Sequence, residues 1–291
     1  MITASIEKLR DPFLLTVGKN YYLYGTGWVC FRNSSGSLDG PWEALGQVVS
    51  VPEDAKGCFW APEVHPYNGA YYMFTTYLSA KTGHRGCTVM RATAPEGPFE
   101  EVSNGPVTPP SWDSIDGTLY IDEEGQPWMV FVHEWTCMPG HIGGMAAAKL
   151  SADLTHMITE PIELFRANAA PWATAGVTDG CWMYRTASGQ LLMLWSNFSD
   201  AGYCVGIARS DNGRIDGQWR QDSTLLYGKE LGMQYDGGHG MIFTDTDGQA
   251  YLSIHSPNSP VGDRSERPIF LPIREEGDTL ICDLPAGSTL F

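Results

Sequence analysis

The sequence predicts an all-β protein, a five-bladed β-propeller that occupies the whole chain, residues 1–291, as a single domain. Three observations lead to this prediction. A β-hairpin pattern occurs five times, at intervals of about 50–60 residues. A polar tetrapeptide marker occurs later in most of these units. Long segments with the helical spacing of apolar residues, which a parallel α/β fold needs, are missing.

The first strand of each hairpin is a short aromatic or aliphatic run preceded by polar or turn residues. The five runs are PFLLTV (12–17), PEVHPY (62–67), GTLYID (117–122), GCWMYRT (180–186) and GMIFTD (240–245). A polar turn and a second strand follow, in 18–28, 68–77, 124–135, 188–198 and 247–257. A unit of this length has room for four strands, which is the size of one propeller blade.

The tetrapeptide marker occurs in the second half of the unit. Its copies are DGPW (39–42), EGPF (96–99) and DGQW (216–219), with TEPI (159–162) as a degenerate copy. Such regular spacing argues against a β-sandwich. Because the chain contains no linker-like or low-complexity stretch, one domain is expected.

The composition restricts the possible partners. The formal net charge is −16, whereas a nucleic-acid backbone or an anionic membrane surface needs Lys and Arg to neutralise it. Neither is therefore expected as a partner. No apolar run has the roughly 20 residues of a spanning helix, and the N-terminus resembles no signal peptide. A cytoplasmic protein with reduced cysteines is therefore expected.

The propeller architecture predicts a ring of polar side chains. The first strand of every blade lines the central channel, so equivalent positions converge on one mouth of it. The leading residues are Asp11, Glu63, Asp116, Asp179 and His239. The second strand runs antiparallel and ends at the same mouth. Its end brings a rim of further residues, namely Trp28, Tyr77, His133, Glu134, Trp135, Asn197, Phe198 and His255.

Two interpretations of the acids remain open. Asp at the start of a strand is a common turn and capping residue. Alternatively, the acids form a site, and carboxylates this close together cannot all ionise at their ordinary pKa. One raised and one lowered pKa suit a general acid and a general base. Glycoside hydrolysis uses such a pair, with one carboxylic acid for the leaving oxygen and one carboxylate for water.

These motifs resemble glycoside hydrolase family 43, the five-bladed propeller arabinofuranosidases, xylosidases and arabinanases. The resemblance covers nearly the whole chain. It is carried by RDPF (10–13), FWAPEV (59–64), SIDGTLYIDEEGQPW (114–128), TDGCWMYRTASGQLLMLWS (178–196) and GGHGMIF (237–243). None of the motifs is specific alone, but five in this order at blade spacing are.

The resemblance implies hydrolysis with inversion and a role for each acid. Asp11 in RDPF would be the general base, and Asp116 in SIDG would raise the pKa of the acid and orient it. The general acid would be Asp179 in TDGC. The resemblance also implies a structural calcium or other cation in the channel, with His239 of GGHG as its only direct protein ligand.

The acid position departs from the family pattern. The family usually has Glu-Gly-Pro there, whereas this chain has Asp179-Gly180-Cys181. Asp is one methylene shorter, and a misplacement of about 1 Å can cost about a hundredfold in rate. Asp179 could still be the acid in a shifted arrangement. Glu134, at the end of the second strand of the third blade, could replace it. The protein could also be a weak or lapsed enzyme.

The sequence therefore predicts an inverting glycosidase that removes a terminal pentose from oligosaccharides. The expected sugar is α-L-arabinofuranose, with β-xylose or galactose as the alternatives. The predicted sugar-binding residues are Trp28, Trp60, Trp135, Phe198 and Arg267, with Arg264 in the same loop as Arg267. The competing hypothesis is a non-catalytic carbohydrate-binding propeller descended from such an enzyme.

Overall fold

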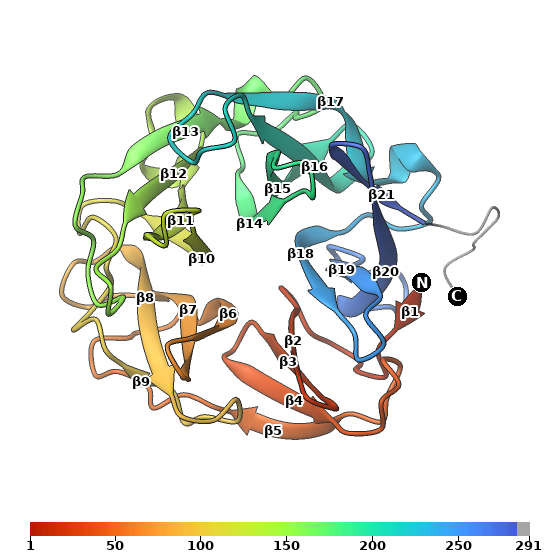
Figure 1. Cartoon of the computed structure of the whole chain (residues 1–291), viewed down its shortest axis with the longest axis horizontal. Helices are drawn as coiled ribbons and strands as arrows, with labels where there is room; N and C mark the ends of the chain where they lie inside the picture. Colours follow the sequence, from red (N-terminus) through yellow and green to blue (C-terminus); the bar gives the residue numbers. More distant parts are fainter. Residues whose placement is uncertain (284–291) are drawn as a thin grey trace.

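Five antiparallel β-sheets surround a central axis in the computed structural model, which describes residues 1–283 (Figure 1). Each sheet takes its strands in chain order from the inside outward, apart from the last. The predicted all-β, five-bladed propeller is thereby confirmed.

Each of the first four blades is built from four consecutive strands. Blade 1 contains β2 (Phe13–Val17), β3 (Asn20–Gly25), β4 (Val29–Asn33) and β5 (Glu43–Gln47). Blade 2 contains β6 (Trp60–Tyr67), β7 (Ala70–Leu78), β8 (Arg85–Ala92) and β9 (Glu100–Glu101). Blade 3 contains β10 (Ser114–Ile121), β11 (Pro127–His133), β12 (Gly144–Lys149) and β13 (Ile162–Arg166). Blade 4 contains β14 (Asp179–Arg185), β15 (Leu191–Ser199), β16 (Gly202–Ser210) and β17 (Trp219–Tyr227).

The fifth blade joins the two ends of the described chain. It contains β18 (Gly238–Thr244), β19 (Ala250–Ser256), β20 (Arg267–Glu276), β21 (Thr279–Cys282) and the N-terminal β1 (Ile2–Thr3). Both β1 and β21 pair with β20, antiparallel. The first strand of the chain thus closes the ring by completing the last sheet (Figure 1).

The tetrapeptide markers are the approaches to the outermost strands. Residues 39–42 lead into β5, 96–99 lead into β9, and 216–219 run into β17. The degenerate copy at 159–162 runs into β13. Each marker therefore leads into the last strand of its blade, after which the chain crosses to the next blade.

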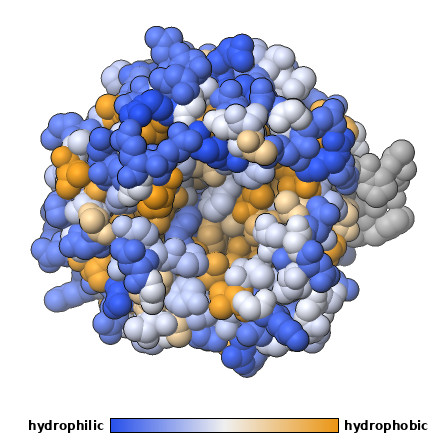
Figure 2. Space-filling view, viewed as in Figure 1, coloured by the Kyte–Doolittle hydropathy of each residue, from blue (hydrophilic) through white to orange (hydrophobic). Residues whose placement is uncertain are grey.

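The core lies between the blades, because the second strands are buried on both faces. In β15 the run Leu191 to Trp195 is fully buried, which explains its almost continuous apolar sequence. Burying each such side chain contributes about 1.5–3 kcal/mol. Hydrophilic residues cover most of the periphery in Figure 2, and hydrophobic ones show toward the centre. Among the helices of residues 1–283, none is long and apolar enough to cross a membrane.

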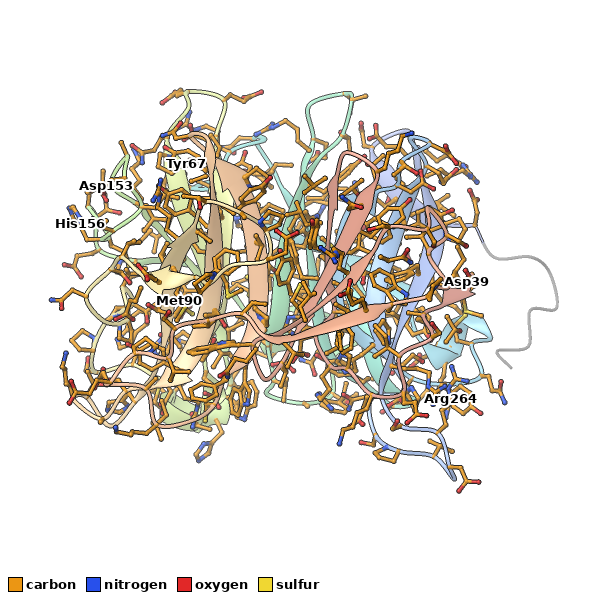
Figure 3. All side chains as sticks on the ribbon, turned by 90° about the horizontal axis from the view of Figure 1, so that it is seen from below. Asp39, Tyr67, Met90, Asp153, His156 and Arg264 are labelled. Carbon is orange, nitrogen blue, oxygen red and sulfur yellow. The ribbon has the colours of Figure 1, made fainter. Side chains whose placement is uncertain are left out.

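The two faces of the ring carry different connections. The turn between the first two strands of blade 2 begins at Tyr67, and Figure 3 shows this residue on one face. Arg264, in the loop before β20, lies on the opposite face (Figure 3). Arg267, close to Arg264 in the chain, pairs with Ser256 at the end of β19. The inner strand β18 runs antiparallel to β19, and its first residue, Gly238, pairs with His255 at the same end. The inner strand of this blade therefore begins on the Arg264 face.

Candidate active site

One residue in each blade adopts a left-handed backbone where the chain enters the inner strand. The φ angles are 53° at Asp11, 44° at Ala61, 56° at Asp116, 45° at Gly180 and 56° at His239. In blades 2 to 5 this residue opens a β-bulge at which two residues face one on the second strand. For a residue other than glycine such a conformation costs on the order of 1–3 kcal/mol, and it concentrates at functional sites.

The amide of each left-handed residue donates a hydrogen bond to a side chain of the preceding blade. The bonds are Asp11 to His255 Nδ1 (3.3 Å), Ala61 to Thr26 Oγ1 (3.2 Å), Asp116 to Thr76 Oγ1 (3.1 Å), Gly180 to Asp116 Oδ2 (2.9 Å) and His239 to Ser196 Oγ (2.9 Å). This cycle satisfies five amides at the strand entries, four of which the bulges remove from the sheets. It also locks the entry of every inner strand to its neighbour.

The cycle is irregular at one point. In the other blades the side chain that accepts the amide hydrogen lies near the end of the second strand or directly after it. Thr76, for example, pairs with Trp60. The corresponding residue in blade 3 is Val132, which pairs with Ile115 and has no acceptor. The amide of Gly180 therefore bonds to Asp116 Oδ2 instead. This bond fixes the Asp116 carboxylate next to residue 179.

These strand entries surround a pocket of about 370 Å³ at the mouth of the channel. It is lined by Arg10, Asp11, Thr26, Trp60, Ile115, Asp116, Glu134, Trp135, Asp179, Tyr203 and His239. Seven of these were predicted as site residues from the sequence: Asp11, Trp60, Asp116, Glu134, Trp135, Asp179 and His239. Residues that are more than 200 positions apart in the chain thus meet in one cavity with acidic and aromatic walls.

Asp11 has surroundings that favour a carboxylate. Burial alone would raise its pKa, but electrostatic interactions with His239, His255 and Arg10 outweigh burial and hold the pKa below its ordinary value. The hydroxyl of Thr26 donates a hydrogen bond to Asp11 Oδ2, which favours the charged form further. Asp11 is therefore ionised at neutral pH.

Asp116 and Asp179 are shifted in the other direction. Burial and the nearby charge of Asp11 raise the pKa of Asp116 to about 6, although His239 opposes the shift. Burial and the charge of Asp116 raise the pKa of Asp179 to about 7. The pocket thus holds one carboxylate that is ionised and one carboxyl group, Asp179, that keeps a proton up to about neutral pH.

Two histidines face Asp11, and their pKa values are shifted in opposite directions. Nδ1 of His239 lies 3.3 Å from Asp11 Oδ1 and 3.8 Å from Asp116 Oδ2. Burial opposes protonation of this ring, yet these carboxylates raise its pKa. His255 is neutral, because its Nδ1 accepts the Asp11 amide and burial lowers its pKa to about 4. Its Nε2 then donates to Asn258 Oδ1, at 3.1 Å.

Glu134 lies in the pocket wall in a close ion pair. Arg85 Nε donates to Glu134 Oε2 at 2.6 Å, and the Arg85 guanidinium also lies over the Trp60 ring. Burial raises the pKa of Glu134 above its ordinary value, although this bonded arginine opposes the rise. A carboxylate in such a pair is stabilised as the anion, so the pair favours a structural or binding role over proton donation.

Two members of the expected ring, Glu63 and Asp179, do not occupy the left-handed position of their blades. In blade 2 the left-handed position belongs to Ala61, whereas Glu63 lies two residues further and does not line the pocket. Glu63 is buried against Thr118 and His65 instead. In blade 4 the position belongs to Gly180, and Asp179 precedes it. Asp179 nevertheless faces the pocket from the start of β14.

Two predicted aromatic wall residues lie outside the pocket. Trp28 is fully buried, because the second strand of blade 1 ends at Gly25 and the chain has turned away before Trp28. Its indole donates to Thr75 Oγ1, and the ring stacks on Phe59. Phe198 packs on Tyr203 with ring centroids 5.1 Å apart, and Tyr203 is the residue that lines the pocket.

The predicted arginines of the last blade are also absent from the pocket lining. Arg267 begins β20, the third strand of its blade, and does not line the pocket. Arg264 lies over the Tyr235 ring, with 4.9 Å from the guanidinium carbon to the ring centroid. Arg10 supplies the positive charge instead. It is held by the Asn258 carbonyl at 2.9 Å and by Glu266 at 3.4 Å.

Arg10, Thr26, Ile115 and Tyr203 line the pocket without having been predicted. Arg10 and Ile115 directly precede Asp11 and Asp116 in sequence, so the motifs themselves could have indicated them. Tyr203 belongs to a third strand and pairs with Phe198 across a tight turn. Its position needs the register of that hairpin, for which the sequence gives only weak signals.

Comparison with solved structures gives close matches over the whole ring. An endo-arabinase from Bacteroides thetaiotaomicron VPI-5482 shares 35% identity with a TM-score of 0.83, covering 95% of this chain and 98% of that one. A thermostable family-43 glycoside hydrolase has the same TM-score of 0.83 at 23% identity, which supports the shared fold.

The curated relatives match over shorter segments. A probable arabinan endo-1,5-alpha-L-arabinosidase B from Aspergillus fumigatus is 28% identical over 148 residues, covering 44% of this chain and 39% of the relative. An extracellular exo-alpha-(1->5)-L-arabinofuranosidase from Cellvibrio japonicus is 26% identical over 164 residues, covering 50% and 45%. The chain thus spans less than half the length of these two relatives.

The sequence model that describes glycosyl hydrolases family 43 matches residues 5–273, which include every strand that contributes to the pocket. The motifs that carried the resemblance, the five-bladed ring and the acidic pocket all fall inside this range. The chain belongs to glycosyl hydrolase family 43.

Proposed function

We propose that this protein is an inverting glycosidase that releases terminal α-L-arabinofuranose from arabino-oligosaccharides. The observation that carries the proposal is the opposite shift of two carboxyl groups in one pocket. The pKa of Asp11 is below its ordinary value, and the pKa of Asp179 is raised to about 7. An inverting glycosidase needs such a base and such an acid at the same pH.

In the proposed reaction Asp11 is the general base. Its carboxylate takes a proton from a water molecule, and the water oxygen attacks the anomeric carbon. Asp179 gives its proton to the glycosidic oxygen as the bond to the leaving group breaks. Asp11 is then protonated and Asp179 ionised, so one proton passes through solvent before the next turnover.

Asp116 has the proposed role of tuning and orienting the acid. Its charge raises the pKa of Asp179, and its Oδ2 accepts the amide hydrogen of Gly180, directly after the acid. Trp60 and Trp135 line the pocket and offer apolar surface to a pentose ring. Arg10 offers hydrogen-bond donors to sugar hydroxyls.

A cation at His239 stays a prediction. The contacts of the His239 ring with carboxylates run through Nδ1, which leaves Nε2 as the nitrogen available to a metal. Residues 1–283 hold no group of three or more His, Cys, Asp or Glu side chains arranged to bind one. A cation held there would have His239 as its single protein ligand, and water would complete its shell. Such an ion would supply positive charge near the carboxylates.

The product pattern on linear α-1,5-linked arabino-oligosaccharides tests the proposal. Release of arabinose alone from the first time points supports exo action. A mixture of shorter oligosaccharides supports endo action, which is the second candidate because the 35% identical neighbour is an endo-arabinase. Proton NMR of the first product identifies its anomer, and retention of the α configuration would contradict inversion. Sugar binding in calorimetry without any product would favour the non-catalytic propeller.

The value of kcat/KM should fall on the alkaline side of its pH profile, near pH 7. Asp179 must be protonated to act, so activity is lost as the pH rises through its pKa of about 7, by about tenfold per pH unit. In Asp116→Asn the charge that raises this pKa is gone, and the alkaline limb should move to lower pH. The measurement is kcat/KM from pH 4 to 9 for both proteins.

A control assigns the titrating group. In Asp179→Ala, assayed on an aryl glycoside with an activated leaving group, the alkaline limb should disappear. If it persists, another group controls it, and His239 is the first alternative because the pocket carboxylates raise its pKa too.

A further inference from the structure

We infer that Tyr203 is a positioning residue for the proton donor, and that it compensates for the short side chain of Asp179. The inference rests on the proposed function. Tyr203 Oη donates a hydrogen bond to Asp179 Oδ2 at 3.0 Å, inside the pocket that both residues line. No catalytic role follows for Tyr203 itself, since it acts through the carboxyl of Asp179.

Tyr203 is held rigidly enough to position another group. Its side chain is 2% exposed, and its ring stacks on His255 with centroids 5.7 Å apart. Its backbone amide donates to Asp236 Oδ2 at 3.3 Å. A Cβ atom at Gly238 would lie only 2.5 Å from the Tyr203 ring, so this glycine makes room for the ring.

The hydroxyl of Tyr203 stays protonated and donates. Burial and the negative charge of Asp179 raise the pKa of Tyr203 well above its ordinary value. A neutral phenol next to a carboxyl has one hydrogen, which goes to Asp179 Oδ2. Oδ1 is then the oxygen that carries the catalytic proton.

The hydrogen bond from Tyr203 holds the carboxyl end of the Asp179 side chain. Aspartate could rotate about its side-chain bonds and point its carboxyl away from the glycosidic oxygen, and it starts one methylene shorter than the glutamate usual in the family. The backbone after the acid is fixed by the bond from Gly180 to Asp116 Oδ2, and the carboxyl itself is fixed by Tyr203. Together the two bonds restrict the orientations open to the Asp179 carboxyl.

The test is Tyr203→Phe, which removes only the hydroxyl. Aryl arabinofuranosides with good and poor leaving groups are compared, because a good leaving group does not need protonation. We expect kcat on the poor leaving group to fall about tenfold to a hundredfold, with KM little changed. On the good leaving group kcat should stay within about twofold. The ratio of the two rates does not depend on how much of the variant folds.

Tyr227→Phe is the matched control. Tyr227 is also a buried tyrosine of blade 4, and its hydroxyl donates to the Tyr235 carbonyl at 3.0 Å rather than to a carboxylate. Its loss should leave the ratio of the two rates unchanged. An equal change of the ratio in both variants would overturn the inference, because it would show a general packing effect.

A double variant separates this inference from the proposed function. If Tyr203 acts only through Asp179, adding Tyr203→Phe to Asp179→Ala should cause no further loss on the poor leaving group. If Asp179→Ala behaves as the loss of an acid while Tyr203→Phe behaves as wild type, the inference alone is wrong. If Asp179→Ala shows no leaving-group dependence, the proposed acid itself is wrong.

Discussion

Asp11→Asn is expected to lower kcat on arabino-oligosaccharides by about 10³-fold or more, with little change in the folded structure. Asparagine keeps the shape of the side chain and the hydrogen bond to Thr26, but it cannot take a proton from water. General base catalysis contributes about 10²–10⁴-fold, and this contribution is lost with the base. Initial rates with oligosaccharide and aryl substrates measure the loss.

The loss at Asp11 should be independent of the leaving group. The base acts on the water, and a better leaving group does not replace it, so both classes of substrate should be affected alike. This pattern distinguishes the base from the acid. Activity within about tenfold of wild type on every substrate would contradict the assignment of the base.

Asp54→Asn is a matched control for Asp11. Asp54 is also a buried aspartate with a lowered pKa, and it accepts hydrogen bonds from Ser79 Oγ at 2.6 Å and the Lys81 amide at 2.9 Å. It lies outside the pocket lining. Its replacement should lower thermal stability and leave kcat of the folded protein within about threefold.

The fold could be predicted because the signals repeat. Turn residues before short apolar strands occurred five times, and each copy supported the others. The positions of Asp11, Asp116 and His239 at the channel mouth followed from this repeat, since each opens an inner strand in the same backbone conformation. Local patterns at equivalent positions therefore determine which residues meet, even when they are far apart in sequence.

The errors arose where one residue of register matters. A bulge adds a residue to the inner strand, and the sequence marks it poorly, because Ala61, Asp116, Gly180 and His239 share no side-chain chemistry. Glu63 was consequently placed in the ring although it lies beyond the bulge. Trp28 was misplaced for a similar reason, because its strand ends three residues earlier than the alternation suggests. Only tertiary contacts fix such details.

The identity of the acid leads to the second large effect. Asp179→Ala should lower kcat on natural linkages by about 10²–10⁴-fold, since the departing sugar oxygen would leave without a proton. On an aryl arabinofuranoside with an activated leaving group the same variant should keep most of its activity. Parallel assays of both substrates at pH 6, below the pKa of about 7 for Asp179, measure this contrast.

Glu134→Gln is the comparison that decides between the two candidate acids. Glutamine keeps the length of the side chain but ends the ion pair with Arg85, which lies at 2.6 Å from Glu134 and beside Trp60. If Asp179 is the acid, this change should affect both substrates by a similar factor, mainly through KM, because the wall of the pocket moves. If Glu134 is the acid, the leaving-group contrast should appear in Glu134→Gln and be absent in Asp179→Ala. The ion pair argues for the first outcome. A carboxyl group must hold a proton before it can donate one, and the positive charge of Arg85 stabilises the deprotonated form of Glu134.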